Sequence, residues 1–331
     1  MNKYPEGSFF SFDEYKVKED TLVILASHED RGFASIMSLL ETYNTFEEVF
    51  IITLRDLLDT PDDIGKLPLN SLDLEKQERY RFSVIKNLIK NDIKFFEISG
   101  SMSDLYKVAQ QLNKRIDRKD NVLIDISNFP RELLLEILRW CDSSKLTFLY
   151  SRPRFEGKHE EEFTIGVKGI NVAKGYEGKI RLHKSLLLIL VLGFEGSRSL
   201  FVFRKFEPAR CLALYSDPIN LYQNEKREEY LKILQENNFQ LVSNQRVEAD
   251  SIDSINPFLF KMKLDKLMKD RASVDSENIV IHGIGPKPQM IGMYLWWKEN
   301  QYAQVVHSVP TRRGNPSNGV GSRWIYKIKG A

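Results

Sequence analysis

Residues 278–297 have the sequence NIVIHGIGPKPQMIGMYLWW, and this stretch decides how the chain is interpreted. Its first residues form a continuous apolar run that predicts a buried parallel strand, and an apolar helix is predicted from Pro288 onward. Gly283 and Gly285 punctuate the turn between them, and the turn carries one lysine, Lys287. A doubly wound sheet uses such a turn to present backbone N–H groups and a cation to an anion. The stretch therefore predicts an α/β fold and a phosphate-bearing ligand.

The chain contains a second copy of this pattern. Recurrence of the same strand and helix unit indicates an internal duplication, so we expect two Rossmann-like lobes with doubly wound parallel sheets. Three segments of the first half align with three of the second. At an offset of 157, 122–131 (VLIDISNFPR) aligns with 279–288 (IVIHGIGPKP), and 150–153 (YSRP) aligns with 307–310 (HSVP). At an offset of 167, 22–31 (LVILASHEDR) aligns with 189–198 (ILVLGFEGSR).

Length and composition fit a folded protein with two lobes. The chain has 331 residues, of which 42% are hydrophobic and 28% charged, as is typical of a globular protein with about two domains. We expect an N-terminal Rossmann-like lobe at 1–153 and a C-terminal Rossmann-like lobe at 183–331. Between them, at 154–182, the pattern becomes rich in glycine and charge and predicts a hairpin-like connector.

The charges and the cysteines exclude several kinds of partner. With 48 Lys and Arg against 46 Asp and Glu, the net charge is +2, which is too balanced for an extended nucleic-acid surface, so any anion site must be local. Cys141 and Cys211 are expected to be small buried hydrophobes, and no metal site is expected. The amino end lacks a signal-peptide pattern, and the longest apolar run, 186–194, is too short to cross a bilayer. We therefore expect a cytoplasmic protein with no membrane partner.

Strands and helices alternate along both halves, which predicts parallel sheets covered by helices on both faces. Strands are expected at 22–26, 49–53, 94–98, 122–126, 146–150, 186–192, 211–215, 240–243, 278–281, 303–307 and 323–328, and helices at 33–43, 74–91, 103–116, 131–141, 198–206, 225–237, 256–269 and 288–298.

Ligands of such sheets lie outside the carboxyl ends of the strands, so the residues that follow each strand are the candidates for a site. The candidate ligand-binding residues combine cations, hydrogen-bonding side chains and glycines: Arg31, Ser127, Asn128, Arg131, Gly193, Arg198, Gly283, Gly285 and Lys287. The candidate general acids and bases are Glu29, Asp125, Glu195 and His282. Each candidate also has a purely structural alternative. Arg31 could form a surface ion pair with Glu29, and Arg198 with Glu195. Asp125 could cap a turn, His282 could be a hydrogen-bonded turn residue, and Lys287 could be a solvated lysine at a helix start.

The run 279–290, IVIHGIGPKPQM, resembles the strand, Thr-Gly-Gly-Thr-Lys-x-Met turn and helix of CARF domains, the CRISPR-associated Rossmann-fold ligand sensors. Two such units in one chain resemble the fused arrangement of SAVED domains. The resemblance implies a cyclic oligonucleotide ligand contacted by Gly283, Gly285 and Lys287, a role in prokaryotic antiviral defence, and a separate effector protein as a partner. Both threonines of that motif are absent here, and residues 126–131, ISNFPR, replace the glycine and lysine turn in the first half.

We therefore expect a nucleotide or another phosphorylated small molecule to bind in a cleft between the two lobes, with the chain acting as a sensor. Two alternatives stay open: a nucleotide-processing hydrolase or transferase that uses the same cleft, and a structural subunit of a multi-protein assembly. The sequence has no Gly-x-x-x-x-Gly-Lys-Ser/Thr loop, no Cys-x-x-Cys pair and no His-Glu-x-x-His pattern, so it names neither a cofactor nor a reaction.

Overall fold

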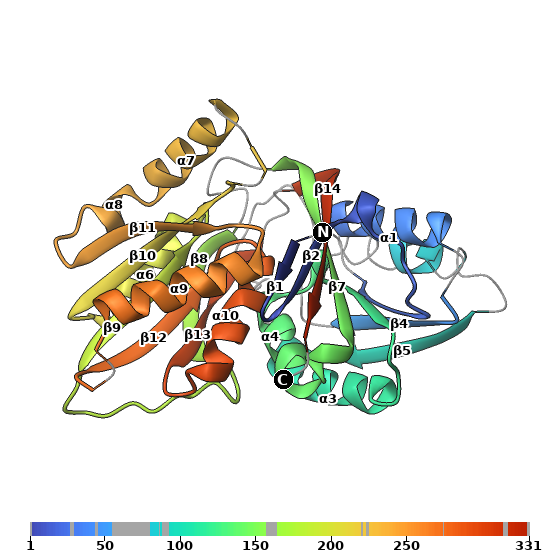
Figure 1. Cartoon of the computed structure of the whole chain (residues 1–331), viewed down its shortest axis with the longest axis horizontal. Helices are drawn as coiled ribbons and strands as arrows, with labels where there is room; N and C mark the ends of the chain where they lie inside the picture. Colours follow the sequence, from blue (N-terminus) through green and yellow to red (C-terminus); the bar gives the residue numbers. More distant parts are fainter. Residues whose placement is uncertain are drawn as a thin grey trace. The chain divides into compact units, whose positions relative to one another are not determined.

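The structure, a computed structural model, describes residues 2–26, 30–43, 46–54, 80–85, 87, 93–156, 164–219, 221–222, 225–273, 275–313 and 317–329. The chain divides into two compact units: the first unit comprises Met1–Glu156 with Asn315–Ala331, and the second unit comprises Gly157–Gly314. Each unit is a mixed α/β structure built on a sheet in which parallel strands dominate (Figure 1).

Within the described residues, the first unit contains an eight-stranded sheet in the order β1-β2-β14-β7-β6-β3-β4-β5. Neighbouring strands are parallel among β7 (Leu146–Glu156), β6 (Val122–Asp125), β3 (Thr21–Leu25), β4 (Glu48–Leu54) and β5 (Lys94–Gly100). The sheet continues beyond β7 with the antiparallel strands β14 (Ser317–Ile328), β2 (Gly7–Ser11) and β1 (Asn2–Tyr4).

Helices cover both faces of this first sheet. One face carries α1 (Asp30–Thr42), and the other carries α3 (Leu105–Ile116) and α4 (Arg131–Trp140) (Figure 1). Short 3-10 turns lie at η1 (Phe12–Glu14), η2 (Met102–Asp104), η3 (Ile126–Asn128) and η4 (Ser143–Lys145). Residues 80–85 are helical, whereas most of the helix predicted at 74–91 lies outside the described residues.

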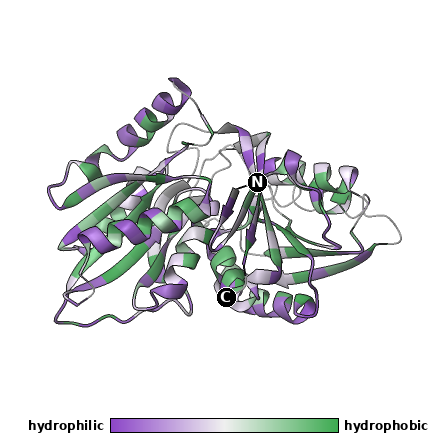
Figure 2. Ribbon diagram, in the orientation of Figure 1, coloured by the Kyte–Doolittle hydropathy of each residue, from purple (hydrophilic) through white to green (hydrophobic). Residues whose placement is uncertain are grey.

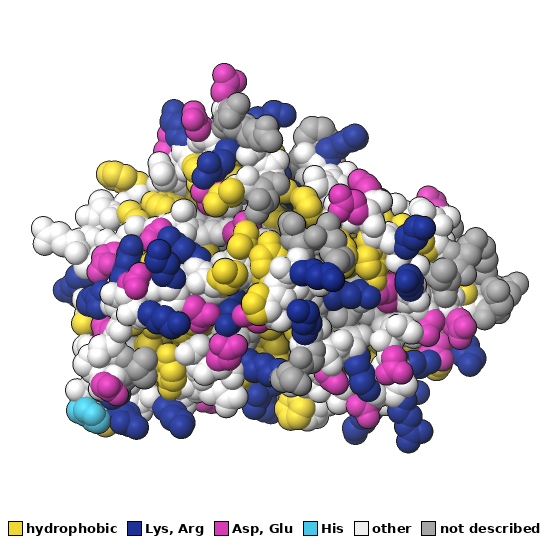
Figure 3. Space-filling view, viewed as in Figure 1, with side chains coloured by type: hydrophobic (Ala, Val, Ile, Leu, Met, Phe, Trp, Pro, Cys, Tyr) yellow, Lys and Arg dark blue, Asp and Glu magenta, His cyan; other side chains and the backbone are white. Residues whose placement is uncertain are grey.

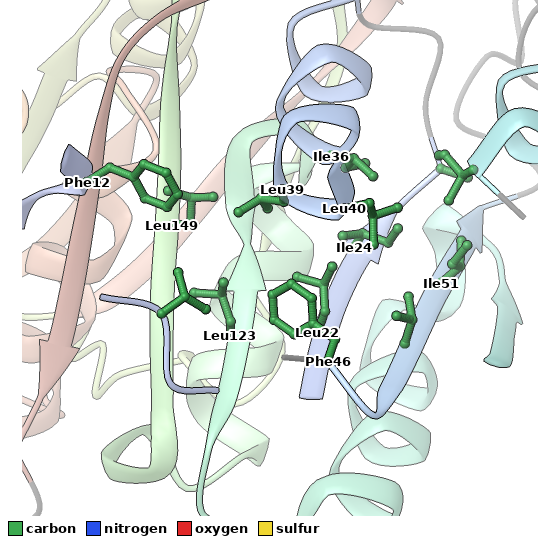
Figure 4. Close-up of a cluster of buried hydrophobic side chains, with 14 of the residues drawn as sticks. Phe12, Leu22, Ile24, Ile36, Leu39, Leu40, Phe46, Ile51, Leu123 and Leu149 are labelled. Carbon is green, nitrogen blue, oxygen red and sulfur yellow. The ribbon is translucent and has the colours of Figure 1, made fainter. Parts of the chain in front are cut away.

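The core of the first unit explains why its central strands have continuous apolar runs. All five residues of β3 are buried. Leu22 and Ile24 of β3 pack against Ile36, Leu39 and Leu40 of α1 (Figure 4), while the alternate residues of β3 face the helices on the other side of the sheet. Because side chains of a strand alternate between the two faces, a sheet covered on both needs apolar residues at every position. The hydropathy colouring shows the same distribution, with hydrophobic residues along the central strands (Figure 2).

The second unit contains a six-stranded sheet in the order β11-β10-β9-β12-β13-β8 within the described residues. The parallel strands are β9 (Ser185–Leu192), β10 (Arg210–Asp217), β11 (Val247–Asp253), β12 (Glu277–Gly283) and β13 (Gln304–Arg313), and β8 (Thr164–Val172) pairs antiparallel with β13.

Helices cover both faces of the second sheet as well. Val202 and Phe203 of α6 (Gly196–Phe206) and Leu241 of α8 (Phe239–Val242) join the apolar cluster on one face. The opposite face carries α9 (Pro257–Arg271), which begins at the side-chain cap of Asn256, and α10 (Pro288–Glu299) (Figure 1). α7 (Glu225–Asn237) buries only Leu234.

The five parallel strands follow the same order in the two units. Numbered along the chain, β7-β6-β3-β4-β5 and β13-β12-β9-β10-β11 both give 5-4-1-2-3. The strand registers also agree with the sequence offset of 157, since Asp125 pairs with Leu149 in the first sheet and His282 pairs with Val306 in the second. In both units one antiparallel strand lies beside the fifth parallel strand, β14 beside β7 and β8 beside β13.

The prediction of a hairpin-like connector is wrong. β7 continues to Glu156 in the first sheet, and β8 begins at Thr164 in the second sheet, so the two strands belong to different sheets. Each instead pairs with a strand from much later in the chain, β14 or β13. Alternating sequence identifies a strand, but it does not identify the strand's partner.

The strand predicted at 240–243 is also wrong, because Phe239–Val242 forms the short helix α8. A run of four apolar or neutral residues cannot be assigned to a strand or a helix by periodicity. The third strand of the second unit is β11, at Val247–Asp253, and among the described strands it pairs with β10 alone. As an edge strand with several exposed positions it carries acidic residues, so it lacks the apolar run by which the other strands were predicted.

The surface fits the small net charge. Lys and Arg side chains are interspersed with Asp and Glu over the face in Figure 3. No helix within the described residues is long and apolar enough to span a membrane.

Candidate ligand-binding site

Asp125 ends β6 and organises the turn that follows it. One carboxylate oxygen accepts from the backbone N–H of Ser127 at 2.9 Å, which caps η3, and the other accepts from Ser35 Oγ of α1 at 2.6 Å. Ser35 Oγ lies 2.7 Å from Ser151 Oγ on β7, and the N–H of Ser151 donates to Ser127 Oγ at 2.8 Å. Burial raises the pKa of Asp125, although these hydrogen bonds act in the opposite direction. Asp125 thus has the capping role expected as one of its two alternatives.

Arg31 lies in the first turn of α1 and is buried. Its Nη2 donates to the carbonyl oxygen of Ser127 at 2.7 Å, and its guanidinium lies 5.8 Å from the ring centre of Tyr150 on β7. The arginine therefore connects the start of α1 to the turn after β6. Glu29, the expected acidic partner of Arg31 and a candidate general base, lies outside the described residues.

Asn128 follows in the same turn and differs from its neighbours. It is 6% exposed, and neither amide atom of its side chain has a hydrogen-bond partner within the part of the chain that the structure describes. The side chain packs directly against Gly32 in the first turn of α1, where a Cβ atom would overlap the Asn128 amide. Only a glycine at position 32 lets the amide approach the amino end of α1 so closely.

The second unit has a buried polar cluster at the matching position. Arg198 of α6 pairs with Glu195 at 2.7 Å, donates from Nε to Ser308 Oγ at 3.0 Å and donates from Nη2 to the carbonyl oxygen of Ser308 at 2.7 Å. All three residues are buried. The ion pair expected as an alternative for Arg198 is confirmed, but it is buried rather than at the surface.

His282 is the penultimate residue of β12 and completes this cluster. The N–H of Ser308 donates to His282 Nε2 at 3.2 Å, and Ser308 Oγ lies 3.0 Å from the same nitrogen. Because Nε2 accepts a hydrogen bond from a backbone N–H, we assign the neutral tautomer with the proton on Nδ1. His282 and Ser308 are fully buried, so this hydroxyl and imidazole stabilise the fold rather than form an exposed nucleophile and base.

The two clusters use corresponding positions of the two units. Arg31 and Arg198 come from the helix after the first parallel strand. Asp125 and His282 lie at the carboxyl end of the fourth strand, and the fifth strand supplies a serine in each case. These serines, Ser151 and Ser308, were not selected from the sequence. Their place in the aligned segments YSRP and HSVP was a signal that could have found them. Ser35, one turn beyond Arg31 on α1, carried no such signal.

The candidate glycines of the second unit lie at close contacts within the protein. A Cβ atom on Gly193 would lie 2.6 Å from the carbonyl oxygen of Ile284, and one on Gly283 would lie 2.6 Å from Met290 Cε. A Cβ atom on Gly285 would overlap the side chain of Gln289. These glycines allow the loops after β9 and β12 to pack against each other and against α10.

The two remaining candidates place cations at helix amino ends. Lys287 is the N-cap residue of α10, and Arg131 is the first residue of α4. Both side chains are half-buried. A cation is unfavourable next to the positive end of a helix dipole, and an anion bound at that end would offset it.

The cysteines have the expected place in the core. Cys141 and Cys211 are buried free thiols, and burial raises the pKa of each to about 12. Both thiols are therefore fully protonated at neutral pH, and neither is set up as a nucleophile.

No protein-family model matches this chain, and no curated protein matches its sequence. Among solved structures, the chain is similar to Can2 from Sulfobacillus thermosulfidooxidans in complex with cyclic tetra-adenylate, with 11% identity, coverage of 86% of this chain and 95% of that chain, and a TM-score of 0.26. It is also similar to an adenylation, ketoreductase and pseudo Asub multidomain structure of a keto acid-selecting NRPS module, with 10% identity, coverage of 83% of this chain and 27% of that chain, and a TM-score of 0.22. Both likenesses are weak and carry no argument about function.

Proposed function

We propose that this chain binds a nucleotide or a cyclic-oligonucleotide-like phosphorylated ligand at the carboxyl ends of its parallel strands, as a sensor rather than an enzyme. The observation that carries the proposal is the buried amide of Asn128, which has no hydrogen-bond partner within the described residues. An unpaired buried polar group costs about 1–3 kcal/mol. A ligand that offers a donor and an acceptor side by side, as nucleobases do, would satisfy both amide atoms.

The surroundings of Asn128 suit an anionic ligand. The amide packs on Gly32 in the first turn of α1, a helix of 13 residues whose amino end carries a positive partial charge. Arg31 in the same turn adds a full positive charge. In the second unit, Lys287 is a cation at the amino end of α10, the helix that corresponds to α4 of the first unit. Phosphate groups are stabilised by this combination of helix end and cation.

The state of the acidic and basic candidates favours binding without turnover. Glu195 is paired with Arg198, Asp125 caps a turn, and His282 accepts a hydrogen bond from the backbone. All three are buried. A general acid or base must reach its substrate within hydrogen-bond distance, and each of these groups would first have to give up its present partner.

We also propose that each unit is a Rossmann-like lobe and that the two lobes arose by duplication. The shared 5-4-1-2-3 strand order, which is the 3-2-1-4-5 order of Rossmann sheets seen from the other edge, supports this. The agreement of the strand registers at the 157-residue offset supports it further. The lobe boundaries at 153 and 183, the effector partner, the role in defence and the cytoplasmic location stay predictions.

The test compares Asn128→Leu with the wild-type chain. Thermal unfolding and ligand affinity are measured with cyclic oligoadenylates and with mononucleotides, and chromatography checks whether any ligand is converted. Leucine has nearly the shape of asparagine and removes the unpaired amide, so the variant should be as stable as the wild type or more stable by about 1–3 kcal/mol. Its affinity for the ligand should fall about tenfold or more.

Asn238→Leu is the matched control. Asn238 is also buried, but its Nδ2 donates to the carbonyl oxygens of Gly193 at 2.9 Å and of Leu234 at 2.8 Å, so its loss should reduce stability. A destabilised Asn128→Leu variant with unchanged affinity would assign Asn128 to packing. A wild-type chain that no nucleotide stabilises would refute the proposal, and conversion of a bound nucleotide would favour the enzyme alternative.

A further inference from the structure

Helix α7 of the second unit differs from α6 and α9 in how little of it is buried. The structure describes all 13 residues of α7, and Leu234 is the one that is buried. In contrast, α6 buries five of its 11 residues, and α9 buries seven of its 15. In Figure 1, α7 projects beyond the rest of the second unit. Elements with few buried side chains open more easily than the core, so α7 is held less firmly by packing than α6 or α9.

The contacts of α7 place it at the edge of the second sheet where β9 and β10 end. Arg227 pairs with Asp217, the last residue of β10. The ring of Tyr230 meets that of Phe194, two residues beyond β9, in a T-shaped arrangement with the ring centroids 4.8 Å apart. Asp217 and Phe194 are both buried. α7 therefore covers part of the edge at which α/β sheets bind their ligands.

The carboxyl end of α7 is fixed to the loop after β9. Asn237 Nδ2 donates to the carbonyl oxygen of Phe194 at 3.0 Å, and Asn238, just beyond the helix, donates from Nδ2 to the carbonyl oxygen of Gly193 at 2.9 Å. A Cβ atom on Gly196 would overlap the carbonyl oxygen of Asn237. Short side chains and backbone make these contacts, so this end of the helix has little freedom to move.

The amino-terminal half of α7 is attached through a long side chain near the surface. Arg227 donates from Nε and Nη2 to the two carboxylate oxygens of Asp217, at 2.8 and 2.7 Å. The Arg227 side chain is 40% exposed, whereas that of Asp217 is 4% exposed. A bidentate pair fixes the geometry of both groups, but water competes for an exposed guanidinium. Once α7 moves away, water can also reach the carboxylate that the helix covers.

We propose that α7 is a hinged cover that pivots at Asn237 and Asn238 and is held closed by the pair of Arg227 and Asp217. In the open state its amino-terminal half leaves the ends of β9 and β10, and Asp217 and Phe194 become accessible to solvent. The motion does not depend on the proposed ligand, because the pivot and the ion pair belong to the protein itself.

Distances between two spin labels test the hinge in the full chain without any ligand. One pair of labels is attached at Glu228→Cys in α7 and Arg204→Cys in α6, both exposed positions. The second pair combines Arg204→Cys with Glu236→Cys, beside the pivot. Counted from Asn237, residue 228 is nine residues away (237 − 228 = 9) and residue 236 is one residue away (237 − 236 = 1). Rotation about the pivot therefore moves the label at 228 about nine times as far.

Arg227→Gln removes the ion pair, and Lys226→Gln is the matched control, because Lys226 is an exposed cation at the adjacent position of the same helix. We expect Arg227→Gln to add a population in which the distance between labels at 204 and 228 is shifted by about 5 Å or more, as for a rotation of about 20° at a radius of about 14 Å. The distance between labels at 204 and 236 should stay the same. Lys226→Gln should give the distances of the wild type.

An unchanged distance between labels at 204 and 228 in Arg227→Gln would overturn the proposal. Equal broadening of both distances would also overturn it, since α7 would then unfold rather than pivot. If Arg227→Gln lowers the urea midpoint of the whole chain, Arg227→Lys takes its place. That variant keeps the charge but loses the bidentate geometry, so it should show the same shift in a smaller population. Because no ligand is present, the result is independent of the test of Asn128.

Discussion

At the scale of single residues, the buried ion pair between Arg198 and Glu195 means that a substitution at Glu195 tests stability rather than catalysis. The sequence alone offered Glu195 as a general base or as the partner of Arg198. In the structure its carboxylate lies 2.7 Å from Arg198 Nη1, and both side chains are buried. Two buried charges of opposite sign depend on each other, because removing one leaves the other without compensation.

Glu195→Gln should therefore reduce the free energy of unfolding by about 3–5 kcal/mol, the usual cost of breaking a buried pair from one side. Urea denaturation of the full chain measures it. Glu236→Gln is the control, since Glu236 is exposed and lies 3.9 Å from Lys232 on the surface of α7, and it should change stability little. If Glu195→Gln and Glu236→Gln lowered the free energy of unfolding by the same small amount, the buried pair would contribute nothing to stability.

At the scale of elements, the glycines after the strands allow close packing of loops. Gly193 follows β9 and lies against the carbonyl oxygen of Ile284 in the loop after β12. Because that neighbour is backbone, it cannot move aside as the end of a flexible side chain could. Gly169 lies in the edge strand β8, and apart from its chain neighbours no atom of the described residues lies within 4 Å of the place its Cβ atom would occupy. Comparing Gly193 with Gly169 therefore distinguishes a glycine that packing requires from one that packing does not require.

Gly193→Ala should destabilise the chain by about 1–3 kcal/mol, the range for overpacking a close contact. Gly169→Ala should leave stability unchanged or raise it by about 0.4–1 kcal/mol, because alanine restricts the unfolded chain. Chemical denaturation checks both, and ligand affinity is measured on the same proteins. If Gly193→Ala were as stable as the wild type but bound ligand more weakly, Gly193 would belong to the ligand site instead.

At the scale of the whole chain, Glu19 joins three distant segments within the first unit. Its carboxylate accepts from Tyr15 Oη at 2.6 Å and from Thr147 Oγ1 of β7 at 2.8 Å, and it pairs with Lys327 of β14 at 3.1 Å. Burial by itself raises the pKa of Glu19, but these hydrogen bonds, the charge of Lys327 and the N–H of Lys18 outweigh it. The net pKa is below its ordinary value.

A lowered folded-state pKa means that Glu19 contributes stability above its ordinary pKa, and that this contribution disappears as the pH falls through the folded-state value. The contribution of Asp125 to stability depends on pH in the opposite direction. Its raised pKa means a contribution present below its ordinary pKa that is lost as the pH rises through the folded-state value. Glu19→Gln should therefore lose less stability than the wild type when the pH is lowered from neutral towards about 4, as measured by urea midpoints. Glu41→Gln, at an exposed position of α1, should follow the wild type; parallel curves for all three proteins would contradict the assignment.

Much of the secondary structure could be predicted from the sequence because its signals are local. Continuous apolar runs identified β3, β6, β9 and β12 within a residue or two. The sequence match at an offset of 157 anticipated that Asp125 and His282 would lie at matching positions at the carboxyl ends of their strands. The edge strand β11 was not predicted, because a strand that pairs along one edge and has several exposed side chains needs no apolar run.

The tertiary structure alone decided which groups meet. Ser35 and Asp125 are 90 residues apart, and Arg198 and Ser308 are 110 apart, so no spacing in the sequence relates them. The partners of β14 could not be predicted from sequence spacing either, because β14 comes late in the chain and pairs with the much earlier strands β7 and β2. The sequence by itself determined where the strands with continuous apolar runs and the polar residues that follow them occur, since these signals depend on neighbours along the chain. Whether a polar side chain at a strand end is satisfied, as in Asp125, or left without a partner within the described residues, as in Asn128, depends on segments brought together only by packing.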